Sequence, residues 1–83
     1  MGRRLEPQEA LGQAIRKLRK ERGLTQAQLA QAADTDDKRI SRLERGWTNP
    51  AWGTARRVAA ALGVPLSELA ALAERLERGD EEG

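Results

Sequence analysis

The 83-residue sequence contains no cysteine, histidine, phenylalanine or tyrosine, and two tryptophans are its only aromatic residues. The lack of cysteine excludes disulfides, zinc–thiolate sites and cysteine nucleophiles. The lack of histidine removes the commonest general base and the commonest metal ligand. An enzyme would therefore depend on a carboxylate pair or an activated lysine in a cleft, for which so small a chain offers little room. We expect no enzymatic activity, no metal ion and no cofactor.

Long apolar runs are also missing. The longest uninterrupted one, AAALGVPL, is far shorter than the roughly 20 residues of a membrane-spanning helix. The N-terminal segment MGRRLEPQEA is charged and lacks the apolar core of a secretory signal. We therefore expect no membrane contact and a cytoplasmic location. The length predicts a single domain, residues 1–83, whose core is thin enough for a partner or a second copy to help.

Net charge is small but unevenly distributed. The total is +2, yet residues 1–22 carry +4, residues 23–57 carry +2 and residues 58–83 carry −4. This asymmetry favours contact between the basic part and nucleic acid, with the acidic end facing away. The alternative is the ordinary solvated surface of charged helices.

Helix-forming residues dominate the sequence, strand-forming residues are scarce, and no stretch alternates with a period of two. The composition therefore predicts an all-α fold. Thr25 and Gln28 have the spacing of a capping box, Asp36 is a suitable N-cap, and Gly23 is a suitable helix end. The five predicted helices span residues 7–22, 25–33, 36–45, 51–62 and 66–78, followed by a frayed acidic tail over 79–83.

The second and third predicted helices are short, and only two or three residues separate them. A turn that tight makes two helices cross steeply, which is the geometry of a helix-turn-helix. Ala30 supplies the small side chain that a close crossing requires. Asp34 stands where the turn needs a left-handed backbone, which Asp tolerates.

The third predicted helix has two chemically different sides. At about 100° per residue, Ile40, Leu43 and Glu44 fall on one side of this helix. Its opposite side carries Lys38, Ser41, Arg42 and Arg45. A basic side opposite a core side is what a helix in a DNA groove requires, because arginine and lysine bind guanine edges and phosphates. The alternative is the solvated polar side of any amphipathic helix.

From about Leu11 to Leu69 the sequence resembles the Cro/C1-type, XRE-like helix-turn-helix family of phage repressors and bacterial transcriptional regulators. The resemblance lies in the order and spacing of IRKLRKERGLTQAQLAQ, of RISRLERG, and of NP followed by RRVAAALGVPLSEL. It implies a compact domain of five helices, of the lambda-repressor type, whose third helix enters the DNA major groove. The sequence departs from the family pattern at Asp34, often Gly, and at Asp37, often Gln, Ser, Thr or Arg.

The resemblance also implies roles for individual residues. It places Gln26 on a phosphate near the start of the second helix. It places Asp37, Lys38 and Arg42 at base edges, with Arg45, Trp47 and Thr48 near the DNA backbone. It pairs Arg19 of the first helix with Glu44 of the third. Ser41 joins the candidate DNA-binding residues because it shares the basic side of the helix.

Large apolar residues outside the family pattern leave alternatives open. Leu72 and Leu76 lie beyond the family's usual end, so they either form a homodimer seam or pack back on the first helix. Trp47 either lies against DNA backbone or covers the edge of the core. Trp52 is expected in the core at the start of the fourth helix.

Together these features predict a sequence-specific, double-stranded-DNA-binding transcriptional regulator of bacterial or phage type, acting as a homodimer in the nucleoid region of the cytoplasm. The competing hypothesis is a protein-interaction module of the same fold, either an adaptor or the antitoxin-type half of a pair. The acidic residues Asp34, Asp36 and Asp37 favour that second hypothesis.

Overall fold

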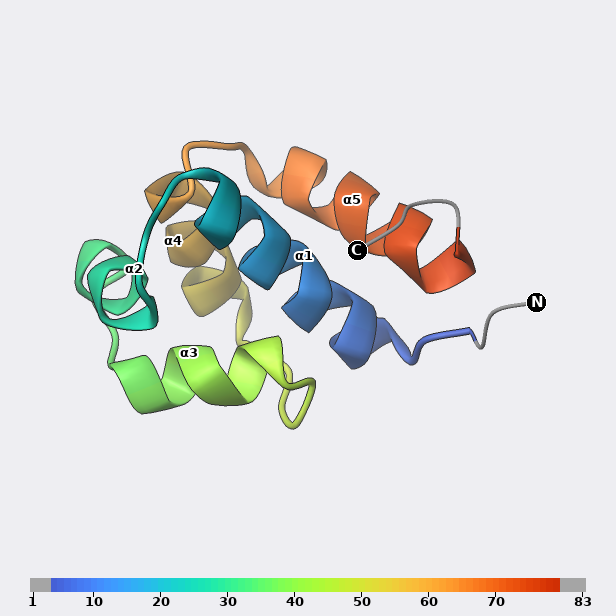
Figure 1. The fold of residues 1–83 in the computed structure, drawn as a ribbon, viewed down its shortest axis with the longest axis horizontal. Coiled ribbons are helices and arrows are strands. Elements are labelled where there is room, and N and C mark those ends of the chain that lie inside the picture. Colours follow the sequence, from blue (N-terminus) through green and yellow to red (C-terminus); the bar gives the residue numbers. More distant parts are fainter. Residues whose placement is uncertain (1–3, 80–83) are drawn as a thin grey trace.

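The computed structural model describes residues 4–79, which form five α-helices and no strand (Figure 1). This confirms the predicted all-α class with a helix-turn-helix. Four of the helices are one residue shorter at one or both ends than expected, because the flanking caps are not themselves helical. Residues 80–83 of the predicted tail lie outside the described residues, and Gly79 ends the last helix with φ of 80°. The helices are α1 (Pro7–Glu21), α2 (Gln26–Ala32), α3 (Asp37–Glu44), α4 (Trp52–Ala61) and α5 (Leu66–Arg78).

Side-chain caps begin α2 and α3 where the sequence indicated. The Gln28 backbone N–H donates to Thr25 Oγ1 at 3.0 Å, and the Thr25 N–H donates to Gln28 Oε1 at 2.9 Å. The Arg39 N–H donates to Asp36 Oδ1 at 2.8 Å. These bonds satisfy N–H groups that have no partner inside a helix, so they fix where each helix starts.

The turn between α2 and α3 adopts the conformation that its sequence allows. Asp34 has φ of 57°, in the left-handed region. The Thr35 N–H donates to the Ala30 carbonyl at 2.9 Å, which closes the end of α2. The direction in which α3 leaves the turn is therefore set by hydrogen bonds of the main chain.

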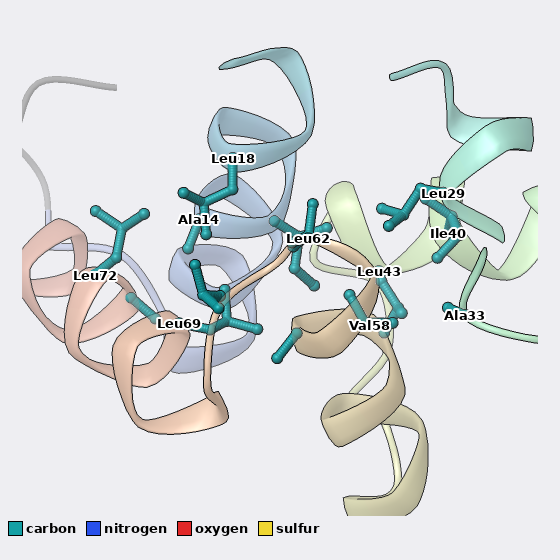
Figure 2. Packing of buried hydrophobic residues seen from close by; sticks show 14 of the residues in the cluster. Ala14, Leu18, Leu29, Ala33, Ile40, Leu43, Val58, Leu62, Leu69 and Leu72 are labelled. Carbon is teal, nitrogen blue, oxygen red and sulfur yellow. The ribbon is translucent and has the colours of Figure 1, made fainter. Parts of the chain in front are cut away.

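One hydrophobic core draws on every helix. Helix α1 packs along α5 on one side and against α3 on the other, while α2 packs against α3 and α4. Figure 2 shows side chains from all five helices pointing into one cluster, among them Leu18, Leu29, Ile40, Val58 and Leu69. Within residues 4–79, none of the helices is both long and apolar enough to cross a membrane.

Two predictions about large apolar residues are wrong. The leucines proposed as an exposed dimer seam, Leu72 and Leu76, are only 5% and 4% exposed, because α5 packs their side of the helix along α1, as the alternative prediction had it. Trp52 is 71% exposed rather than part of the core. It lies two positions before buried Thr54, about 200° around α4, and so faces solvent.

The crossing of α1 and α3 is too close for any side chain at Gly12. A Cβ on this buried helical glycine would overlap the Leu43 carbonyl oxygen and lie 2.8 Å from that of Glu44. The main chain at the end of α3 therefore rests directly on α1. Sequence reasoning identified Ala30 as a close-contact residue and did not identify Gly12.

We expect Gly12→Ala to lower the free energy of unfolding by about 1–3 kcal/mol, because the added methyl must push α3 away from α1. Urea denaturation followed by circular dichroism measures this change. Gly53→Ala is the matched control, since a Cβ there meets only Arg57 Nη1 at 3.5 Å. It should be neutral or stabilising by up to about 1 kcal/mol. Equal stability of the two variants would show that the crossing can relax.

Candidate nucleic-acid interface

Helix α3 lies at one edge of the fold (Figure 1). Ile40 and Leu43 are buried at 0% and 2% exposure, whereas Lys38, Arg42 and Arg45 are exposed. Ser41, on the same side, is half-buried. Among residues 4–79, neither Lys38 nor Arg42 has an acidic partner within ion-pair distance. Their N–H donors are thus available to an anionic ligand.

Arg39 belongs to this surface and was missed by the sequence analysis. A hollow of about 220 Å³ is lined by Asp36, Arg39, Arg42 and Thr48. It brings two guanidinium groups and a hydroxyl, which are donors of the kind that bind phosphate, together with the Asp36 carboxylate. Arg39 lies three residues before Arg42, so helical spacing alone could have revealed the pair.

The end of α3 holds an arginine against an aromatic ring. The Arg45 guanidinium carbon lies 4.9 Å from the centre of the Trp47 ring, a cation–π distance. Gly46 between them has φ of 74°, and a Cβ there would lie 2.9 Å from Glu9 Cα. The Trp47 N–H donates to the Arg42 carbonyl at 3.0 Å. Trp47 is 68% exposed, so it does not cover the core.

A buried carboxylate connects α3 to both preceding helices. Glu44 Oε2 accepts from Arg19 Nε at 2.6 Å, and its Oε1 accepts from Arg19 Nη2 at 3.0 Å. Arg19 Nη1 also donates to the Leu24 carbonyl at 2.8 Å. The hydrogen bonds that Arg19 donates to Glu44, reinforced by the negative charge of that carboxylate, raise the pKa of Arg19 against the opposing effect of burial. The two side chains are 11% and 3% exposed, so each charge depends on the other.

Gln26 takes part in this network. Its Nε2 donates to Glu44 Oε1 at 3.0 Å, and the residue is half-buried at the first position of α2. The second N–H on that nitrogen makes no hydrogen bond within residues 4–79. Gln26 is therefore a link between α2 and α3, a role that the sequence did not suggest.

Arg57 of α4 holds the turn that precedes α3. Its Nε donates to the Ala33 carbonyl at 3.1 Å, and its Nη2 donates to Thr54 Oγ1 at 3.3 Å. Ala33 directly precedes Asp34, so the end of α2 is fixed from a third direction. Arg56 and Arg57 are adjacent in the sequence, and no sequence signal distinguishes the one that makes this contact.

The acidic residues around the start of α3 have separate places. Asp36 caps the helix, Asp34 occupies the left-handed turn position, and Asp37 is exposed on the first turn beside Lys38. Within the described part of the chain, no three acidic side chains are grouped in a way that could hold a metal ion.

Several helix-turn-helix proteins are similar to this chain in sequence or in fold. A family model described as a helix-turn-helix domain matches residues 10–72. An immunity repressor protein of Bacillus phage phi105 is 42% identical over 59 residues, which are 71% of this chain and 41% of the phage protein. The chain therefore spans less than half of that relative's length.

Two solved structures illustrate the likeness. The clp gene regulator ClgR from Corynebacterium glutamicum has a TM-score of 0.88 and 28% identity, over 94% of this chain and 83% of that one. The restriction-modification controller protein C.AhdI from Aeromonas hydrophila has a TM-score of 0.73 and 32% identity, over 75% of this chain and 94% of that one.

We expect Glu44→Ala to lower the free energy of unfolding by about 3–5 kcal/mol, because Arg19 would keep a largely buried charge without its partner. Because the pKa of Arg19 is raised, the stability that its ion pair with Glu44 contributes is lost only when the pH rises through that raised pKa. The part of the lost unfolding free energy of Glu44→Ala that comes from Arg19 should thus not change with pH near neutrality. Glu21→Ala is the control: it removes an exposed partner of Lys17 at 3.7 Å and should cost less than about 1 kcal/mol. Chemical denaturation measures both variants, and equal losses would contradict a special role for Glu44.

Proposed function

The chain belongs to the helix-turn-helix family, as its resemblance to Cro/C1-type regulators predicted, and from this premise we propose that it binds double-stranded DNA in a sequence-specific way and regulates transcription. The observation that carries this proposal is the outward side of α3, where exposed cations stand opposite Ile40 and Leu43 of the core. A DNA-binding regulator needs this basic side of α3 to be held rigidly and to have no acidic partner within its own chain. The network at Glu44 supplies the first condition, and the solvent-facing cations meet the second.

The geometry supports a division of contacts along α3. Lys38 and Arg42 lie on the exposed part of the helix, where their amino and guanidinium groups can bind guanine O6 and N7. Arg39 and Thr48 share a hollow with Arg42 that suits a phosphate. The stacked pair Arg45 and Trp47 continues this surface beyond the end of α3, and half-buried Ser41 and Gln26 would add polar contacts. In this arrangement phosphate contacts set the register and base contacts provide specificity.

Homodimerisation is part of the proposal, although not through Leu72 and Leu76. One such domain offers a small contact area, and two copies on half-sites one helical turn apart multiply its affinity. The proposed place of action is the bacterial cytoplasm, on the nucleoid. The proposal assigns binding and no catalytic step to the chain.

The competing function, a protein-interaction module, depended on three aspartates near α3. Asp36 is used as a cap and Asp34 as a turn residue. Only Asp37 remains as an acidic group without a structural task on this surface. The exposed carboxylates of Asp36 and Asp37 are outnumbered by the four exposed cations of α3 and its C-terminal cap, which favours a polyanionic ligand over a basic protein.

We expect Lys38→Ala with Arg42→Ala to abolish specific binding to a site selected from random duplex DNA. Each lost base contact costs about 1–3 kcal/mol of binding free energy, while stability should change by no more than about 0.5 kcal/mol per exposed substitution. Binding is measured by fluorescence anisotropy at several salt concentrations, because release of counterions makes phosphate-driven binding salt-dependent.

The matched control for this pair is Arg16→Ala with Lys20→Ala, which removes the same charge from exposed positions on α1. It should reduce affinity only slightly and for all sequences alike. If both double variants bind as wild type does, α3 is not the reading helix. If no variant, nor the wild type, binds duplex DNA at low salt, the protein-interaction function replaces the proposed one.

We expect Asp37→Ala to bind non-cognate DNA more tightly and to lose discrimination at one base pair of the selected site. The carboxylate of Asp37 repels phosphates and most acceptor-rich base edges, yet it can accept a hydrogen bond from the cytosine N4 amino group. Repeating the site selection with the variant tests this. The control, Asp36→Ala, removes the cap and should cost about 0.5–2 kcal/mol of stability with base preference intact. Unchanged affinity and preference in Asp37→Ala would leave Asp37 as a helix-end charge alone.

A further inference from the structure

A hollow of about 350 Å³ lies along the outer side of α4. It is lined by Trp52, Gly53, Arg56, Arg57 and Ala60. At about 1.5 Å per residue, these positions extend over roughly 12 Å of the helix. The lining combines an indole and two of the smallest residues with two guanidinium groups, and it contains no carboxylate. The hollow is therefore apolar and cationic at the same time.

Arg57 is held in one position in this hollow. Its Nε donates to the Ala33 carbonyl at 3.1 Å, and its Nη2 donates to Thr54 Oγ1 at 3.3 Å. Its Nη1 makes no hydrogen bond within residues 4–79, and a Cβ added to Gly53 would lie 3.5 Å from it. The unused N–H groups of Nη1 thus lie beside a residue that has no side chain to cover them. Because the guanidinium is already fixed, a ligand that accepts from Nη1 does not have to order it.

Arg56 supplies a second cation to the hollow. It is exposed, and among residues 4–79 neither Arg56 nor Arg57 has an acidic side chain within ion-pair distance. Trp52 lies one helical turn before Arg56 and is 71% exposed, although tryptophan is usually well buried. Tryptophan and arginine are the residues that most often carry the binding energy of protein interfaces. Two cations beside an uncovered indole therefore indicate a docking surface.

We propose that this hollow is a docking site for an acidic segment of a different protein, in which a carboxylate lies next to an apolar side chain. The carboxylate accepts hydrogen bonds from Arg57 Nη1 and from Arg56, and the apolar side chain covers the indole of Trp52. Gly53 and Ala60 allow the main chain of the segment to approach α4 closely. None of these residues belongs to the candidate DNA surface, so the inference goes beyond the proposed function and does not depend on it.

The charge of the hollow disfavours a second copy of this chain as its occupant. In a contact with two-fold symmetry, residues near the axis face their own copies, so the cations of the hollow would face cations. On its other side, Trp52 borders a neutral groove between α1, α4 and α5, whose lining includes Leu11, Leu66 and Ala70. Positive charge is therefore confined to the α4 side of the indole, and that side requires an anionic occupant.

Phosphates of DNA also bind guanidinium groups, but the composition of the hollow favours a protein. A duplex backbone presents a row of phosphates and no apolar side chain that would cover an indole. The connection from α3 joins α4 at Trp52, whereas Arg56 and Arg57 lie more than one turn further along the helix. Phosphates beside α3 would therefore meet the indole end of the hollow before its cations.

The first test uses fluorescence of Trp47→Gln, in which Trp52 is the only indole. The probe is a short acetylated and amidated peptide in which glutamates flank every leucine, and the control peptide has glutamine in place of each glutamate. The glutamate peptide should shift the emission of Trp52 to the blue in a saturable way. The glutamine peptide should bind about tenfold more weakly or less, because the charge-assisted hydrogen bonds are lost. An emission that neither peptide changes overturns the inference.

The second test measures binding of the glutamate peptide to variants of the full chain by calorimetry. Arg56→Gln removes one cation, and Gly53→Gln fills the hollow while keeping both arginines; each should weaken binding about tenfold. The matched control Arg16→Gln makes the same change at an exposed position of α1 and should bind as wild type does. Melting temperatures show that each variant is folded. Unchanged binding in both hollow variants overturns the inference.

The remaining tests separate the docking site from the other surfaces. Lys38→Ala with Arg42→Ala should bind the peptide as wild type does, and a loss there would place the peptide on α3 and overturn the inference. Arg56→Gln should bind the selected duplex as wild type does. An equal loss of duplex binding would make the hollow a phosphate contact, and a loss of self-association in sedimentation equilibrium would make it a contact between copies. Either result overturns the inference.

Failure of this inference and failure of the proposed function are distinguishable. Duplex binding without peptide binding leaves the DNA function intact and overturns the docking site. A wild type that binds the peptide in the hollow and ignores duplex DNA supports the docking site and refutes the DNA function.

Discussion

The buried carboxylate of Glu44 is the interaction on which the arrangement of the helices depends. Its two oxygens accept from Arg19 of α1 and from Gln26 of α2, while its own backbone forms the last turn of α3. Arg19 extends the connection to the Leu24 carbonyl in the loop before α2. A charge buried to this degree is tolerated only when its donors are in place. The network therefore favours the one arrangement of the first three helices that satisfies every donor and acceptor, and α3 is presented at a defined angle.

Close backbone contacts hold α3 in place together with the ion pair between Arg19 and Glu44. Gly12 allows the carbonyls at the end of α3 to rest on α1, and Gly46 allows the chain to pass Glu9. Arg57 fixes the other end of α3 indirectly, through the Ala33 carbonyl before the turn. Because these contacts use the inner side of α3, its outer cations contribute little to folding. The residues of the outer side can therefore vary without a large effect on stability.

The two exposed indoles lie on two different surfaces of the molecule. Trp47 is stacked on Arg45 and extends the basic side of α3, whereas Trp52 borders a neutral groove between α1, α4 and α5. Only five positions separate them in the sequence, yet the left-handed Gly46 and the start of α4 direct them to different surfaces.

The sequence by itself determined the five helices, their caps at Thr25 and Asp36, the left-handed turn at Asp34 and the two-sided character of α3. These features follow from helical periodicity and from hydrogen bonds within a few residues, so local chemistry suffices. The pairing of Arg19 with Glu44 was indicated by family resemblance, since nothing local links residues in separate helices. Only the tertiary structure decided that Leu72 and Leu76 face α1, that Trp52 faces solvent, and that Gly12, Gln26 and Arg57 position α3. Periodicity shows which residues share a side of a helix, but which neighbour covers that side depends on how distant helices cross.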